Sequence, residues 1–181
     1  MESITLKEIV GYLPYKLKVK SVDIFENDPI FELGLETTSN IKGVVSIDWV
    51  LRDNFKPLLY PLSMLTQEIE HNGEKIIPIV ELAKIALGDN YEKNHLTVIN
   101  DDKFATLSMH STPFFEKAKY IIFRFDEIQK SFTLNVFDYE FKPITTYSVK
   151  NQLQMFEKLY EWHFDVHGLI ERGLAIDKSK I

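Results

Sequence analysis

The segment KYIIFRFDEIQKSFTLNVFDY, residues 119–139, decides the fold class more clearly than any other part of the chain. Large apolar residues alternate with other residues on each side of the polar stretch 127–130. Alternation with a period of two is typical of strands that bury one face, so this segment predicts a β-hairpin. Residues 95–109 predict a second hairpin, which turns at Asn100-Asp101-Asp102.

Shorter strands and helices are expected around these hairpins. Alternation predicts strands near residues 16–22, 30–37 and 42–50, with Val45, Ile47 and Trp49 on one face of the last strand. Helical spacing predicts a first helix that Thr5 caps and Pro14 ends, and a second helix from Pro78 to Gly88. Strands that come in hairpins, rather than in strict alternation with helices, favour an α+β fold in which helices pack on an antiparallel sheet. No linker or repeat interrupts the chain, so we expect a single domain, residues 1–181.

Residues 66–77 allow two interpretations. Leu62, Leu65 and Ile69 have helical spacing, and Asn72-Gly73 could end that helix. Asn-Gly is equally a strong signal for the tight turn of a hairpin. We favour the helix slightly, and the sequence leaves the choice open.

The C-terminal stretch YSVKNQLQMFEKLYEWHFDVHGLIERGLAID, residues 147–177, predicts a long amphipathic helix that Ser148 caps. An amphipathic helix cannot bury its apolar face alone. We therefore expect this element to meet residues 58–65, or the helix face formed by Ile79, Leu82 and Ala86.

His163 and His167 lie one helical turn apart in this stretch, and Glu171 follows one turn later. Such spacing suits two metal ligands on one helix. The zinc-protease motif needs Glu directly after the first His, however, and Phe164 stands there. Both histidines also fall within the apolar stripe, so we expect buried packing positions without a metal.

Composition excludes several classes of function. The chain has no cysteine, which removes disulfides, thiolate metal sites and thiol nucleophiles. Its net charge is −6, and the densest basic run is Lys16, Lys18 and Lys20, which argues against binding to nucleic acid. We find neither a signal peptide nor an apolar stretch long enough to cross a bilayer, so a cytoplasmic protein without membrane association is expected.

Three side chains are candidates for a surface that contacts a partner. Trp162 falls at the edge of the C-terminal apolar stripe, and Arg124 and Lys130 belong to the hairpin at 119–139. We expect the hairpins to carry recognition, because surface segments vary most readily between relatives.

Three segments carry a resemblance: LPYKLKV (13–19), KPLLYPLSMLTQEIEHNGEKIIPIVELAKI (56–85) and LYEWHFDVHGLIERGLAID (159–177), about a third of the chain. They resemble short uncharacterised proteins of Bacteroidetes genomes and of their phage or prophage-like elements. The resemblance implies an origin in a mobile element and brings no activity with it. In these relatives the position of His167 is often Phe, which implies a packing role.

The sequence thus favours a small, non-catalytic accessory or interaction protein whose partner is a protein and which needs no cofactor. Two alternatives remain. One is a metal-dependent hydrolase that uses His163 and His167, and the other is a nucleic-acid-binding accessory protein.

Overall fold

The computed structural model describes residues 2–22, 29–35, 43–88, 96–101, 104–110, 120–126, 128–138 and 140–181; side chains are described for all of these except 96–110 and 120. Contacts divide the chain into two compact units, one formed by Met1–Pro61 with Glu157–Ile181 and the other by Leu62–Phe156. Each unit contains both helices and strands, which confirms the α+β class. The expectation of a single domain, residues 1–181, stays a prediction.

The first unit contains a five-stranded mixed sheet in the order β12-β4-β1-β2-β3. Strand β1 is central and pairs antiparallel with both β2 and β4, whereas β12 is parallel to β4 and β3 is parallel to β2. Its elements are α1 (Leu6–Ile9), the 3₁₀ helix η1 (Val10–Tyr15), β1 (Lys18–Ser21), β2 (Ile30–Gly34), β3 (Val44–Ser46), α2 (Ile47–Leu51), β4 (Phe55–Leu59), β12 (Ile176–Asp177) and the 3₁₀ helix η4 (Lys178–Lys180).

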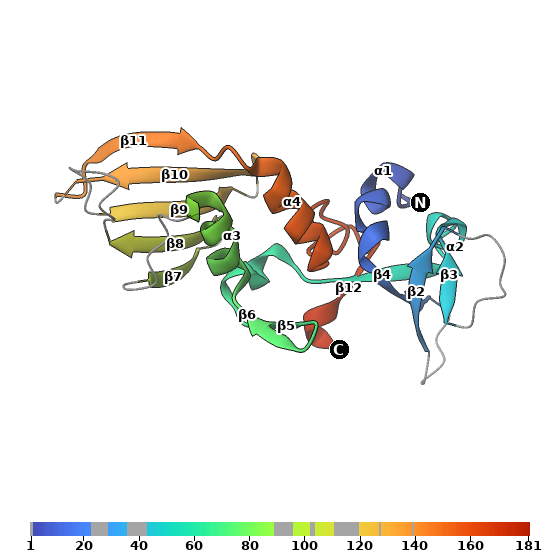
Figure 1. Cartoon of the computed structure of the whole chain (residues 1–181). Coiled ribbons are helices and arrows are strands. Elements are labelled where there is room, and N and C mark those ends of the chain that lie inside the picture. The colour runs from blue at the N-terminus through green and yellow to red at the C-terminus, as the bar shows by residue number, and fades with distance from the viewer. Residues whose placement is uncertain are drawn as a thin grey trace. The chain divides into compact units, whose positions relative to one another are not determined.

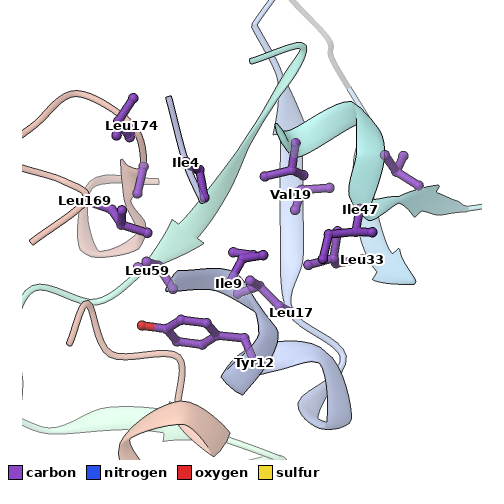
Figure 2. Close-up of a cluster of buried hydrophobic side chains, with 13 residues drawn as sticks. Ile4, Ile9, Tyr12, Leu17, Val19, Leu33, Ile47, Leu59, Leu169 and Leu174 are labelled. Carbon is purple, nitrogen blue, oxygen red and sulfur yellow. The ribbon is translucent and has the colours of Figure 1, made fainter. Parts of the chain in front are cut away.

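Buried side chains from both ends of the chain form the core of this unit. Figure 2 shows Ile9 and Tyr12 of the N-terminal helical segment beside Leu17 and Leu59, with Leu169 close by. The C-terminal segment joins this core because Ile176 and Asp177 pair with Leu58 and Leu59. The predicted meeting of segments 58–65 and 159–177 is therefore confirmed at its first residues, although the contact is made by strands and not by a packed helix.

The second unit is built on a five-stranded antiparallel meander, β11-β10-β9-β8-β7 (Figure 1). Each strand in this order pairs antiparallel with the next, so both hairpins predicted from the sequence are confirmed. The elements are η2 (Leu62–Thr66), β5 (Ile69–His71), β6 (Glu74–Ile76), α3 (Pro78–Leu87), β7 (Leu96–Asp101), β8 (Phe104–His110), β9 (Tyr120–Asp126), β10 (Ser131–Phe137), β11 (Pro143–Ser148) and the start of α4 (Gln152–Glu161).

One face of this meander is packed with aromatic rings. Phe123 and Phe125 of β9 and Phe132 of β10 are fully buried, and the Phe123 and Phe132 rings are 5.7 Å apart. Phe156 of α4 covers the same face, with its ring centre 5.6 Å from that of Phe132. The alternation in residues 119–139 therefore has the predicted cause, since its apolar members point into the core.

Two local predictions are corrected. Residues 69–76 form the hairpin β5–β6, not a helix, because Asn72 (φ 51°) and Gly73 (φ 82°) adopt the left-handed conformations that a two-residue turn needs. The strand predicted at 42–50 ends at Ser46, whose hydroxyl accepts a hydrogen bond from Asp48 N and begins α2. Trp49 therefore lies on a helix. The turn expected at Asn27-Asp28 lies outside the described residues.

The long C-terminal helix is also corrected. Helix α4 begins at Gln152, so Ser148 is not its cap, and it ends at Glu161. His163 then adopts a left-handed φ of 61°. His163 N donates to Tyr160 O at 3.0 Å and Phe164 N donates to Leu159 O at 2.8 Å, the two hydrogen bonds of a Schellman motif. The chain turns there, so residues 162–175 form a compact loop.

Candidate interaction surface

His163 and His167 do not share a helix face, because the Schellman turn separates them. His163 is buried, with 8% of its surface exposed, and its Nε2 lies 2.8 Å from Tyr15 O. His167 is partly buried, and its Nε2 lies 3.2 Å from the Tyr160 hydroxyl. Each imidazole thus has its own hydrogen-bond partner, so the geometry gives no support to a shared metal between them.

Glu171, the third candidate ligand, is exposed. In the part of the chain that the structure describes, no group of three or more His, Asp or Glu side chains is placed to hold a metal ion. No helix among the described residues is both long and apolar enough to cross a membrane.

The loop around the histidines is held by buried hydrogen bonds. The Tyr12 hydroxyl donates to Phe164 O at 2.6 Å and accepts from Val166 N at 3.3 Å. Burial raises the pKa of the Tyr12 phenol, which keeps it a neutral donor. The buried carboxylate of Asp165 accepts from the backbone amides of Leu169 and Ile170, both at 2.8 Å.

Strand β4 fixes the other side of the same loop. Tyr60 N donates to His163 O and Asp165 N donates to Tyr60 O, both at 2.8 Å, so Tyr60 and Phe164 form a parallel bridge. The polar atoms of residues 163–165 are therefore engaged in holding the fold. The residues that the sequence marked as chemically distinctive act as structural anchors.

Trp162 is corrected as a candidate contact surface. Only 5% of its surface is exposed, because it continues the buried stripe of Met155 and Leu159 at the spacing i, i+4 and i+7. Trp49 is the exposed tryptophan, at 52%. It borders a small concavity of about 140 Å³ lined by Ser46, Asp48, Trp49, Arg52 and Asn54.

Strand β11, which the sequence analysis missed, presents an exposed edge. It has the sequence PITTYS and no charged residue. Ile144 and Tyr147 expose 49% and 46% of their surfaces, and Phe141 just before the strand exposes 61%. In the sheet formed by the described strands, β11 is terminal and pairs with β10. Protein sheets usually protect such edges with lysines, prolines or bulges, because a bare edge can pair with another chain.

Hydrogen bonding to β10 shows which amides of β11 face outward. Val149 N donates to Phe132 O, and the Gln152 side chain forms hydrogen bonds to both Phe132 N (3.0 Å) and Phe132 O (2.6 Å). In an antiparallel strand the N–H and C=O groups of successive residues point to alternate sides. Stepping back from Val149 in twos, the backbone groups of Tyr147 and Thr145 face β10.

The backbone groups of the alternate residues, Ser148, Thr146 and Ile144, consequently face away from the sheet. The register shifts between Val136 and Phe137, so Ile144 has no residue opposite it in β10 and forms a bulge. Pro143 and this bulge limit the strand at one end only. The remaining edge offers alternating donors and acceptors to an incoming strand.

The two hairpin candidates lie elsewhere on the same sheet. Lys130 is exposed in the turn between β9 and β10, with φ 47°. Arg124 is partly buried and stands opposite Thr133 of β10 and Thr106 of β8, on the face that alternates with the aromatic core. Their role in partner contact stays a prediction.

A signal for β11 was present in the sequence. Residues 143–148 combine Ile, two Thr and Tyr without a charge, a composition that favours strands. Because both faces of the strand are largely exposed, its apolar residues do not alternate. A search for alternation alone therefore passes over it.

Comparison with protein-family models, with curated proteins and with solved structures found no match to this chain. The resemblance to mobile-element proteins of Bacteroidetes stays a prediction.

Proposed function

We propose that this protein is a non-catalytic interaction protein that binds another polypeptide by adding a strand to the edge of β11. The observation that carries the proposal is the uncharged, exposed edge at 143–148, with outward-facing backbone groups. Main-chain hydrogen bonds supply affinity in such strand addition, and flanking side chains supply selectivity.

The surroundings of the edge support the same function. Phe141, Ile144 and Tyr147 provide exposed apolar area beside the backbone groups, which suits an extended segment with apolar or β-branched side chains. An origin in a phage or another mobile element is part of the proposal and rests on the sequence resemblance. An accessory protein of that kind acts by what it binds.

A pair of variants at one position tests the mode of binding. Thr146→Pro removes the outward N–H and leaves the bonds from Thr145 and Tyr147 to β10 in place, since proline is tolerated at outward positions of edge strands. Thr146→Ala removes the side chain and keeps the N–H. Both variants should retain the circular dichroism spectrum of the wild type.

The readout is capture of proteins from a lysate of the source organism, quantified by mass spectrometry. We expect the wild type and Thr146→Ala to retain the same protein, and Thr146→Pro to lose at least about nine tenths of it. Equal capture by all three proteins contradicts binding through the backbone of β11. The hairpin candidates are tested in the same assay with Arg124→Ala and Lys130→Ala.

A further inference from the structure

The geometry points to a specific occupant of the edge: we propose that β11 pairs antiparallel with β11 of a second copy of this chain, around a two-fold axis at Thr146. This inference rests on the proposed function, since it requires that β11 accept a strand. It adds the identity of the strand and its register.

The register follows from which backbone groups face outward. A two-fold axis perpendicular to a continuous sheet pairs each residue with a residue of the same face, and the hydrogen-bonded pairs join outward-facing residues. An axis at Thr146 therefore places Thr146 opposite Thr146 of the second copy. It also places Ile144 opposite Ser148, twice.

Other centres fit the strand less well. An axis at Thr145 or Tyr147 would oppose residues whose backbone groups already face β10. An axis at Ile144 or Ser148 would leave most of β11 beyond the paired region. Thr146 is the centre of the three outward-facing residues, so it is the position that uses all of them.

The side chains of β11 are compatible with this pairing. In the hydrogen-bonded pairs Thr146 meets itself, and in the pairs between them Thr145 meets Tyr147. Threonine pairs and aromatic–β-branched pairs are favourable across antiparallel strands. The chain as a whole carries a net charge of −6, which opposes self-association, but β11 has no charge of its own.

The strand ends set a limit on affinity. Lys142 and Lys150 approach each other across the axis, and Lys142 already forms an ion pair with Glu140 at 2.5 Å. A six-residue strand pair also buries less than the roughly 1,200 Å² of a standard stable interface. We therefore expect a dimer that forms at micromolar or higher concentration and strengthens at moderate salt.

Because the chain has no cysteine, single cysteine variants test the register cleanly. Thr146→Cys places two thiols opposite each other at a Cα–Cα distance of about 5.5 Å, which a disulfide can bridge. Ser148→Cys is the matched control, because Ser148 is exposed on the same face but meets Ile144 of the second copy. Oxidised dimers are measured on non-reducing gels over a range of protein concentrations.

We expect Thr146→Cys to form disulfide dimers at least ten times faster than Ser148→Cys, and a mixture of Ile144→Cys with Ser148→Cys to cross-link to each other. Sedimentation should show concentration-dependent dimers of the wild type. Equal cross-linking rates for Thr146→Cys and Ser148→Cys overturn the proposal, as does a wild type that stays monomeric at millimolar concentration. In either case, capture that Thr146→Pro abolishes and Thr146→Ala keeps leaves the proposed function standing with a different polypeptide as the occupant.

Discussion

Removing one buried hydroxyl tests whether the loop at 162–175 is a structural anchor. Tyr12→Phe deletes the oxygen that donates to Phe164 O at 2.6 Å and accepts from Val166 N at 3.3 Å, and leaves the ring in place. Each buried polar group that loses its partner destabilises a fold by about 1–3 kcal/mol. Because the second hydrogen bond is long, we expect a total loss of about 2–4 kcal/mol in the free energy of unfolding.

Tyr160→Phe is the matched control. The Tyr160 ring lies edge-on to Tyr12 with ring centres 4.8 Å apart, but its hydroxyl is only partly buried, where it lies 3.2 Å from His167 Nε2. We expect the control to lose about 0.5–1 kcal/mol. The assay is urea unfolding followed by the fluorescence of buried Trp162 in a Trp49→Phe background, compared at equal m-values. If Tyr12→Phe costs no more than Tyr160→Phe, the anchoring role of the hydroxyl is wrong.

Three further predictions concern burial, pH and the turn. Trp162→Ala should lower the free energy of unfolding by about 3–5 kcal/mol and Trp49→Ala by much less, as measured by chemical denaturation; similar losses would contradict the assigned burial. Burial raises the pKa of the Glu8 carboxyl, but hydrogen bonds, chiefly from Arg172, lower it more, so the pKa falls from 4.5 to about 2. Ionised Glu8 thus stabilises the fold above pH 4.5, and the stability advantage of the wild type over Glu8→Gln should shrink as pH falls from 4.5 towards 2 in acid titrations; a constant advantage would contradict the ion pair. Gly73→Ala should lower stability by about 1–2 kcal/mol through its φ of 82° alone, because nothing lies within 4 Å of an added Cβ, and an unchanged melting temperature would refute the assigned turn.

Sequence patterns predicted the elements whose local signals agree with their burial. The hairpin at 119–139 was predicted because its alternating apolar residues are the buried ones. Helix α3 was predicted to begin at Pro78 and stop at Gly88, and both residues flank the helix as expected. In these segments, composition, spacing and turn residues all favour the same structure.

The C-terminal element could not be predicted because its stop signal is unusual. The Schellman position is most often glycine, and here it is His163, so the sequence suggested a helix that continued to Gly168. With the helix extended, Trp162 fell near the polar face and the two histidines fell in one row. Tertiary hydrogen bonds from Tyr12 and Tyr60 fix the loop, and no local pattern reports contacts so distant in sequence.

The candidate surface was missed for a related reason. Thr145 and Thr146 belong to a strand that buries neither face well, so alternation is absent, and only the lack of charge in 143–148 marks the segment. The importance of this edge depends on which backbone groups face outward. That property follows from pairing with β10 and is not encoded in side-chain spacing.

Residue-resolved amide hydrogen exchange of β11 tests the central claim most directly. The chain is measured alone at low concentration and again when saturated with its strand-donating partner, either the captured protein or further copies of the chain. The account predicts that the amides of Ile144, Thr146 and Ser148 exchange quickly in the free chain and become protected in the complex, while those of Thr145 and Tyr147 are protected in both. Unchanged exchange at Thr146 on binding would contradict strand addition at this edge.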